Sequence, residues 1–342
     1  MKSVAKQIKQ VYKDIYKIEI LLPDTPLKSI NNYFIRGSER HLWIDTAFNY
    51  PECREAIAEA ITNLGVDMTK TDIFLTHKHE DHCALIDFIA SESSEILSSA
   101  STIKMLRTGE SSLSEQDMHA FLKRNVPQYD QFAQDFKPWN ELSMRNPLNL
   151  SFRTVKHGDT ITVGQYSFSV IETPGHVEGH LCLYERNNGI LISGDHILGS
   201  IFPNLLLWTE SNDIIEEYLT SLDRIELLKV ELVLPGHRNT LIDCRQRIEK
   251  IRNFQERRCE EVLKIVKFDE NSNGLGHAQT GLFTAYDVAV KMRWSVTNNN
   301  FNDFTFEQKV LFISEVSAHL HHLHLLNYLK TEKKGELVYY FA

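Results

Sequence analysis

Three histidines and an aspartate crowd into the six positions of residues 77–82. An apolar run, residues 73–75, leads directly into this segment and predicts a short strand. A strand that ends in a histidine-rich loop directs several imidazoles to one place, and imidazole and carboxylate groups are ligands for transition metals. The alternative is a polar loop that is rich in histidine by chance. The density of ligand-type side chains favours a metal site.

Three further ligand-type side chains follow the ends of predicted strands. Each comes after a glycine, in the pairs Gly175-His176, Gly194-Asp195 and Gly236-His237. Glycine lets the backbone turn sharply at such a point. One Gly-His pair is weak evidence, but the order His, Asp, His downstream of a His-x-His-x-Asp-His segment is a specific pattern. It predicts a site assembled from distant parts of the chain.

Over about residues 15–243 this pattern resembles the metallo-β-lactamase superfamily. The resemblance implies a four-layer αβ/βα sandwich with two metal ions at one edge of its two sheets. It implies that Asp45 supports the histidine loop from behind the ligands. Ala47 stands where the family usually has glycine, a departure that leaves the ligands untouched. The implied ligands are His77, His79 and His176 for the first metal, Asp81, His82 and His237 for the second, and Asp195 for both.

Such a site implies hydrolysis by activated water. Two divalent ions about 3.5–4 Å apart lower the pKa of a shared water and polarise a substrate oxygen. The resulting bridging hydroxide makes a Ser or Cys nucleophile unnecessary. Asp81 is a candidate for accepting or delivering a proton, and His196 is a candidate for a pocket or proton-transfer role. Zinc is the metal expected for His and Asp ligands, although iron and manganese use similar sets.

The remaining histidines are expected to be structural. We expect His180 to fix the loop after His176 by hydrogen bonding rather than to bind metal, and His157 to have no part in the site. A C-terminal group shares the faces of one predicted helix with leucines but lacks nearby carboxylates, so we do not expect it to bind metal. This group is His319, His321, His322 and His324.

Strands and helices alternate twice before residue 244, which predicts two α/β halves facing each other. We therefore expect a catalytic domain over residues 1–244 and a smaller domain over residues 245–342. The second domain reads as three helices, one with Thr284 as its N-cap, then a turn at residues 332–336 and a strand at 337–341. This winged-helix-like order resembles the tail of the β-lactamase-like 2 proteins.

Residues 109–146 interrupt the first domain with a polar, helix-prone segment that carries interleaved aromatic residues. One interpretation is an ordinary helical crossover with a buried aromatic face. The other is a helical flap near the metal site that shapes a substrate pocket together with the apolar run at residues 201–208.

Composition narrows the partners and the compartment. The 342 residues carry a net charge of −9, which gives no overall attraction to nucleic acid or to an anionic membrane. The N-terminus lacks the apolar core of a signal peptide, and no apolar run is long enough to span a membrane. The five scattered cysteines form no CxxC pair and fit free thiols in the cytoplasm.

Among hydrolases of this kind we favour one acting on a small thioester, lactone or carboxylic ester. β-Lactamase activity is disfavoured, because antibiotic-hydrolysing members commonly have cysteine where Asp195 stands. Cleavage of single-stranded RNA is the alternative, since some relatives with such a tail cut RNA. The tail from Gln246 onward carries 13 basic and 12 acidic residues, too balanced for a strong phosphate-binding face. A non-catalytic metal-binding or signalling role is third, and the tail could instead close the cleft or form a homodimer.

Overall fold

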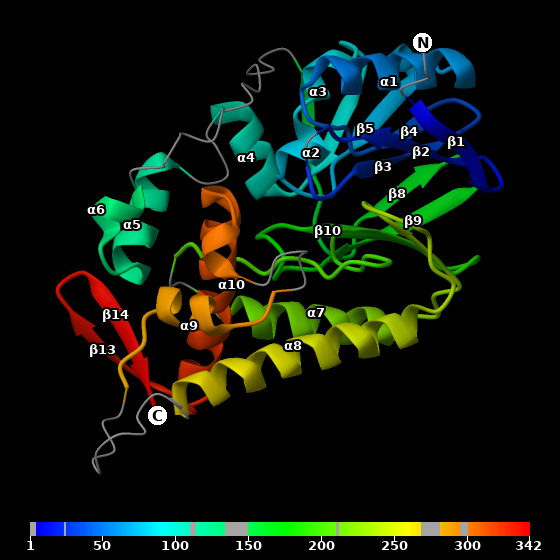
Figure 1. The fold of residues 1–342 in the computed structure, drawn as a ribbon. Coiled ribbons are helices and arrows are strands. Elements are labelled where there is room, and N and C mark those ends of the chain that lie inside the picture. The colour runs from blue at the N-terminus through cyan, green and yellow to red at the C-terminus, as the bar shows by residue number, and fades with distance from the viewer. Residues whose placement is uncertain are drawn as a thin grey trace. The chain divides into compact units, whose positions relative to one another are not determined.

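The protein is described by a computed structural model covering residues 5–23, 25–109, 114–133, 150–209, 212–267, 281–294 and 300–342 (Figure 1). The chain forms two compact units. The first unit comprises Met1–Ser112, Asn140–Pro203 and Ser221–Ile248, and the second comprises Leu113–Trp139, Asn204–Thr220 and Glu249–Ala342. The domain boundary expected after residue 244 stays a prediction. Of the segment 109–146, residues 110–113 and 134–146 lie outside the described residues.

The first unit contains a seven-stranded sheet in the order β1-β2-β3-β4-β5-β6-β7. The first four strands pair antiparallel and the last four pair parallel, with β4 belonging to both runs. The strands are β1 (Ala5–Tyr12), β2 (Ile15–Leu21), β3 (Ser29–Ile35), β4 (His41–Ile44), β5 (Thr71–Phe74), β6 (Glu95–Ser98) and β7 (Ser151–Thr154). Between them lie α1 (Pro51–Leu64), η1 (Met68–Lys70), α2 (Glu80–Cys83), α3 (Ile86–Ile89) and α4 (Ala100–Thr108).

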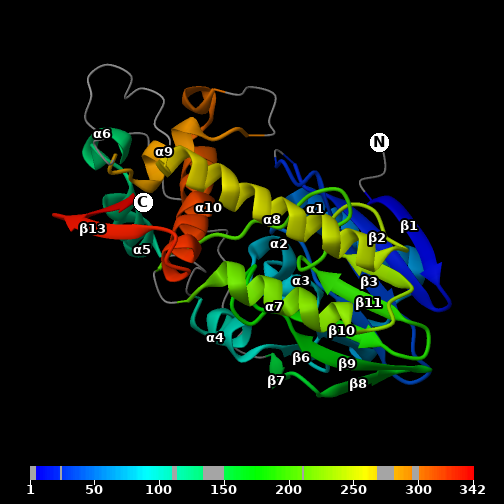
Figure 2. The same cartoon turned by 90° about the horizontal axis from the view of Figure 1, so that it is seen from below.

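A second sheet of five strands has the order β12-β11-β10-β9-β8. Its strands are β8 (Thr160–Val163), β9 (Tyr166–Glu172), β10 (Leu181–Glu185), β11 (Ile190–Gly194) and β12 (Leu232–Pro235). Strands β11 and β12 are parallel, and the other pairs are antiparallel. The chain passes from the first sheet to the second between β7 and β8, which Figure 2 shows at neighbouring edges.

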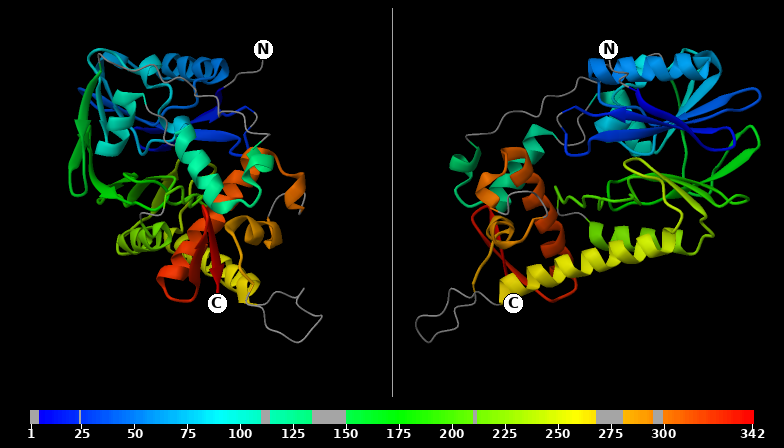
Figure 3. Two further views of the ribbon diagram at one scale, coloured as in Figure 1. Left: turned by 90° about the vertical axis from the view of Figure 1, so that its left-hand side faces the viewer. Right: turned by 45° about the vertical axis from the view of Figure 1, so that its right-hand side comes forward.

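Two apolar cores hold these layers together. One lies between the sheets, where Phe74 of β5 and Leu97 of β6 belong to the same buried cluster as Phe168 of β9 and Leu183 of β10. Figure 3 shows the two sheets stacked face to face. The other core lies on the outer face of the first sheet, where Ala56 and its neighbours on α1 pack against that sheet.

The outer side of the second sheet is covered by the parts of α7 (Ile214–Glu226) and α8 (Cys244–Lys267) that belong to the first unit (Figure 1). Ser221 and Arg224 of α7 donate to the carbonyls of Pro174 and Glu172, where β9 ends. The layers therefore follow the order helix, sheet, sheet, helix, and the expected αβ/βα sandwich is confirmed.

The second unit is mainly helical. Its elements are α5 (Glu115–Asn125), α6 (Tyr129–Phe132), α9 (Ala285–Lys291), η4 (Phe301–Asp303), α10 (Phe306–Leu325), β13 (Lys330–Lys334) and β14 (Leu337–Phe341), with parts of α7 and α8. Helix α10 packs against α9 and α5. Thr284 caps α9 in a capping box, as expected, and Phe283 pairs with Tyr340 of β14. From residue 244 onward the α-helices α8, α9 and α10 are followed by the hairpin of β13 and β14, which agrees with the expected element order. The winged-helix assignment stays a prediction.

The sequence interpretation was wrong at the C-terminal turn, and it omitted the strands β1 and β6. Residues 332–334 lie in β13, which pairs with β14 from Lys330↔Phe341 to Lys334↔Leu337, so only Gly335 and Glu336 reverse the chain. Every residue of β13 is exposed, and its charged sequence therefore looks like a loop. The unexpected β1 (Ala5–Tyr12) is also rich in Lys and Gln, and it forms the edge of the first sheet.

Candidate metal centre

The histidine loop and Asp45 meet because two parallel strands of the first sheet end together. Ile44 at the end of β4 pairs with Phe74 at the end of β5, so the residues that follow both strands lie at one edge. The Asp45 amide donates to the Phe74 carbonyl at 2.9 Å. Asp45 has a left-handed backbone with φ +57°, a conformation that Asp tolerates better than most residues.

The other ligand-type residues follow strands of the second sheet that run in the same direction. Gly194 at the end of β11 pairs with Pro235 at the end of the parallel strand β12, so Asp195 and His237, which follow these strands, lie at the same edge of the sheet. Strand β9 runs parallel to β11 because each is antiparallel to β10, and His176 follows the end of β9. The topology therefore brings three separate strand ends to one edge of this sheet.

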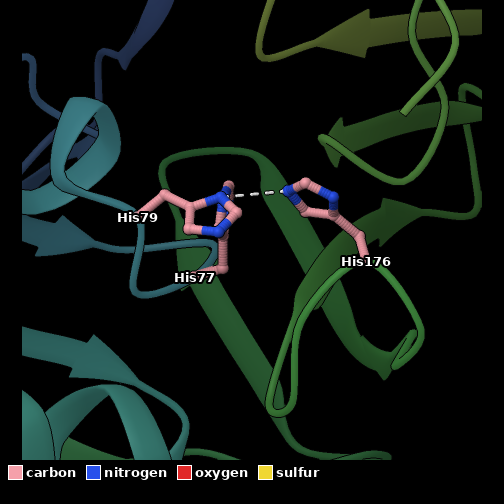
Figure 4. Close-up of side chains that lie close together, drawn as sticks. All are labelled: His77, His79 and His176. Carbon is pink, nitrogen blue, oxygen red and sulfur yellow. Dashed lines mark hydrogen bonds between the residues drawn. The ribbon is translucent and has the colours of Figure 1, made fainter. Parts of the chain in front are cut away.

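Three histidines form the first candidate group, and Figure 4 shows their rings turned toward one another. His79 Nδ1 lies 3.0 Å from His77 Nε2 and 3.1 Å from His176 Nε2. Donors held at 2.0–2.1 Å by a tetrahedral zinc ion are roughly 3.3 Å apart, close to this spacing. The three side chains converge on one point although His176 comes from the opposite sheet.

Two further groups of possible metal ligands overlap: they share His82 with each other, and one of them shares His77 with the first group. Asp81, His82 and His237 form one, in which His237 Nε2 lies 3.2 Å from Asp81 Oδ2. His77, His82 and Asp195 form the other. The Asp195 carboxylate lies among all of them, with Oδ1 3.5 Å from His82 Nε2, and Oδ2 3.4 Å from His237 Nε2 and 3.8 Å from His176 Nε2. All seven sequence-predicted metal ligands thus lie together.

Four atoms of this cluster show that the residues fit divalent ions. They are buried and have no hydrogen-bond partner of normal geometry among the described residues. A buried polar atom without a partner costs free energy, and a cation would supply the missing partner for lone pairs on imidazole and carboxylate. The four atoms are Asp81 Oδ2, His82 Nε2, Asp195 Oδ1 and His237 Nε2.

Asp45 sets the orientation of two of the histidines. Its carboxylate accepts hydrogen bonds from the Thr76 amide, the Thr76 hydroxyl and His82 Nδ1, each at 2.8 Å. Because the Thr76 hydroxyl donates to Asp45, its oxygen accepts from His77 Nδ1 at 3.0 Å. Both imidazoles therefore carry their proton on Nδ1 and present the Nε2 lone pair to the site.

Strand β3 holds the His237 loop, a role that sequence reasoning missed. His237 Nδ1 donates to the Ser29 carbonyl at 2.7 Å, which leaves Nε2 facing the site. The Asn31 side-chain amide donates to the carbonyls of Pro235 and Arg238 at 2.9 and 2.8 Å, and the Tyr33 hydroxyl donates to Pro235 at 2.8 Å. The one available signal was an asparagine pair inside an otherwise apolar strand, where asparagine is disfavoured.

The charge states of His77, His79 and Asp195 suit metal binding. Burial lowers the pKa of His77 well below its ordinary value and that of His79 to about 3, so both rings are neutral ligands at pH 7. Burial acts to raise the pKa of Asp195, but the imidazoles of His237 and His82 hold it well below its ordinary value. Burial likewise opposes protonation of His82, but Asp81, Asp45 and Asp195 raise its pKa to about 9, so a metal ion that binds Nε2 would displace a proton from that nitrogen.

The remaining predicted residues lie outside these groups. His196 is fully buried, its ring centroid is 6.2 Å from that of His180, and burial lowers its pKa to about 3; its proton-transfer role stays a prediction. The His157 amide donates to Glu172. In the second unit His319 hydrogen-bonds to Glu315 and Gln255. The expectation that the C-terminal histidines lack a nearby carboxylate was wrong for His322, whose Nδ1 pairs with Asp213 at 2.8 Å, because Asp213 is distant in the sequence.

Gly194 makes the close approach of the two sheets possible, and Gly194→Ala is expected to destabilise the protein. A Cβ there would lie 2.7 Å from His180 Nε2 and 2.9 Å from Thr76 Cβ, at a residue with φ +47°. Overpacking and left-handed strain together lead us to expect a loss of roughly 2–4 kcal/mol in the free energy of unfolding, measured by urea denaturation. Gly65→Ala is the matched control, because Gly65 has φ +59° with nothing within 4 Å of an added Cβ. Equal losses in both variants would contradict the steric argument.

Comparison with known proteins agrees with this geometry. The family model described as "Metallo-beta-lactamase superfamily" matches residues 25–237. The probable metallo-hydrolase YqjP of Bacillus subtilis (strain 168) is 24% identical over 320 residues, which are 90% of this chain and 92% of that protein. The acyl-coenzyme A thioesterase MBLAC2 of Gallus gallus is 32% identical over 87 residues, which are 25% of this chain and 31% of that protein.

The fold is shared with a solved structure over nearly the whole chain. The crystal structure of the metallo-beta-lactamase family protein TTHA1429 from Thermus thermophilus has a TM-score of 0.78 and 23% sequence identity, covering 97% of this chain and 99% of that chain. The chain therefore belongs to the metallo-beta-lactamase superfamily. Its similarity to a protein named probable metallo-hydrolase supports hydrolase activity, and the His and Asp side chains of this site could hold metal ions.

Proposed function

We propose that this protein is a binuclear metal-dependent hydrolase that cleaves a small ester-type bond, with a thioester as the first candidate and a lactone or carboxylic ester next. The observation that supports the proposal is the convergence of two ligand groups on the Asp195 carboxylate. His77, His79 and His176 would hold one ion, the group containing Asp81 would hold the other, and Asp195 would contact both. Zinc is the first choice for such donors, with iron or manganese as alternatives.

The chemistry needs no nucleophilic side chain. When bound, two divalent ions would lower the pKa of a water and polarise the scissile carbonyl. The residues of the chain supply the orientation: Asp45 and the Ser29 carbonyl fix which imidazole nitrogens face the reaction. We assign the Asp81 carboxylate, whose Oδ2 is buried 3.2 Å from His237 Nε2, as the group that moves a proton between the attacking water and the leaving group.

The choice of a thioester draws on the relatives. A quarter of this chain is similar to a protein named acyl-coenzyme A thioesterase, and nine-tenths is similar to one named probable metallo-hydrolase.

Among the described residues, no helix is long and apolar enough to cross a membrane. None of the five cysteines, all of which are described, forms a disulfide, and the cytoplasmic location expected from the sequence remains part of this proposal.

The test is an assay of the full-length, metal-loaded protein against an acyl-coenzyme A thioester, a lactone, a carboxylic ester and single-stranded RNA. We expect thiol release from the thioester, followed by a thiol-reactive dye, and loss of that release after chelation of the metal. RNA cleavage without turnover of any ester would contradict the proposal and favour the nuclease alternative. Stoichiometric metal binding without turnover of any of these substrates would favour a non-catalytic role.

A further inference from the structure

A chain of buried side chains joins the two backbone groups on either side of Gly194, at the turn that carries Asp195. The Asp195 amide donates to His180 Nε2 at 3.1 Å, and His180 Nδ1 lies 2.8 Å from Thr173 Oγ1. Thr173 Oγ1 lies 3.3 Å from Cys182 Sγ, which lies 3.5 Å from the Ser193 carbonyl oxygen. The chain therefore begins and ends on the neighbours of one glycine.

The two ends fix the direction of every hydrogen bond in between. A backbone amide can only donate, so His180 Nε2 accepts and the ring proton sits on Nδ1, where it is donated to the Thr173 hydroxyl. A backbone carbonyl can only accept, so the Cys182 thiol donates to Ser193. The Thr173 hydroxyl, already an acceptor from His180, then donates to the Cys182 sulfur.

The surroundings leave His180 no alternative arrangement. The side chains of Thr173, His180 and Cys182 are fully buried. A Cβ at Gly194 would lie only 2.7 Å from His180 Nε2, so the ring is tightly packed against the turn. If Nε2 were removed, the buried Asp195 amide would lose its partner, at a substantial cost in free energy.

This arrangement also explains why His180 lies beside the candidate ligands without joining them. Its ring centroid is 5.0 Å from that of His77 and 6.1 Å from that of His176. One of its nitrogens accepts the Asp195 amide proton, however, and the other carries a proton, so neither has a lone pair for a metal.

We propose that His180 is a positioning residue whose hydrogen bond to the Asp195 amide holds that carboxylate between the two metal positions. The inference rests on the metal centre of the proposed function. Asp195 is the ligand common to both positions, so a shift of its turn weakens the binding of both ions. Outer partners of metal ligands typically change metal affinity by about 10- to 100-fold when they are mutated.

The first experiment compares metal binding by His180→Phe and His180→Gln in the full-length protein. The phenyl ring fills the cavity without an acceptor, while the Gln side chain can present an oxygen to the Asp195 amide. Zinc affinity is measured per folded chain by competition with a chromophoric chelator, and stoichiometry by native mass spectrometry. We expect about 10- to 100-fold weaker zinc binding in the Phe variant, and an affinity closer to wild type in the Gln variant.

His319→Phe is the matched control, because His319 is an equally buried histidine of the second unit that hydrogen-bonds to Glu315 and Gln255. It is expected to lower stability without changing zinc affinity. Wild-type zinc affinity in His180→Phe would overturn the inference, and so would an equal loss in His319→Phe, which would indicate a general effect of removing a buried histidine.

The second experiment needs no variant. Long-range ¹H–¹⁵N NMR of the wild-type protein is expected to show the His180 ring protonated at Nδ1 and unprotonated at Nε2, and a proton on Nε2 would overturn the inference. Neither experiment uses a substrate. A protein that binds two zinc ions in a His180-dependent way and hydrolyses no ester would therefore refute the proposed substrate class and leave the role of His180 intact.

Discussion

Asp195→Asn is expected to reduce kcat/KM for the hydrolysed ester by at least roughly 1,000-fold, because several kcal/mol of metal-derived stabilisation are lost and each 1.4 kcal/mol corresponds to a factor of ten. The side-chain shape is retained, but the charge between the two ligand groups is removed. The Asp195 oxygens lie 3.4–3.8 Å from Nε2 of His82, His176 and His237, so this carboxylate lies beside side chains of both ligand groups. Steady-state assays together with metal analysis of the same preparation measure the effect.

Two companion variants make the result specific. Asp81→Asn removes a carboxylate from only one ligand group and is expected to lower the content of one metal more than that of the other. Asp72→Asn breaks an exposed pair with Arg40, and such surface pairs contribute about 0–1 kcal/mol, so wild-type activity is expected. If Asp195→Asn retained two metals and near-normal turnover, Asp195 would not be the shared ligand.

The candidate ligands could be predicted because their signals are local. Residues 77–82 place four ligand-type side chains in one loop, and no long-range information is needed to see them. Asp195 and His237 each follow a glycine at the end of an apolar run, a pattern that the parallel pairing of β11 and β12 turns into proximity. Apolar strands such as β9 (Tyr166–Glu172) were predictable for the same reason, since their burial alternates along the strand.

The supports of the site were not predictable, because they depend on contacts between the two sheets. Asn31 and Tyr33 reach Pro235, about two hundred residues later in the chain, and only the stacking of the sheets brings them together. Likewise, the sequence suggested that His180 forms a structural hydrogen bond, but its partner, the Asp195 amide, follows from the pairing of β10 with β11. Periodicity locates elements, whereas these partners depend on three-dimensional register.

Asp45→Ala is expected to lower the free energy of unfolding by roughly 4 kcal/mol or more, because each of three buried donors that lose their acceptor costs at least about 1 kcal/mol and left-handed alanine adds about 1–2 kcal/mol of strain. Asp45 is 2% exposed, and its carboxylate is the acceptor for the Thr76 amide, the Thr76 hydroxyl and His82 Nδ1. Urea denaturation followed by tryptophan fluorescence measures the loss, and the buried Trp43, whose indole donates to the Asp45 carbonyl, reports on the same turn.

Asp45→Asn separates the support of the histidines from the strain of the backbone. Asparagine tolerates φ +57° and retains one acceptor oxygen, so we expect a smaller loss of stability than with alanine. This single oxygen cannot replace both Oδ1, which accepts from the Thr76 amide, and Oδ2, which accepts from the Thr76 hydroxyl and His82 Nδ1. At least one of these donors then faces an NH2 group, which weakens the support of His82 and, through Thr76, of His77. We therefore expect Asp45→Asn to weaken zinc binding by about 10- to 100-fold even where the protein stays folded. If zinc affinity followed stability alone across the two variants, Asp45 would be supporting the fold and not the orientation of the ligands.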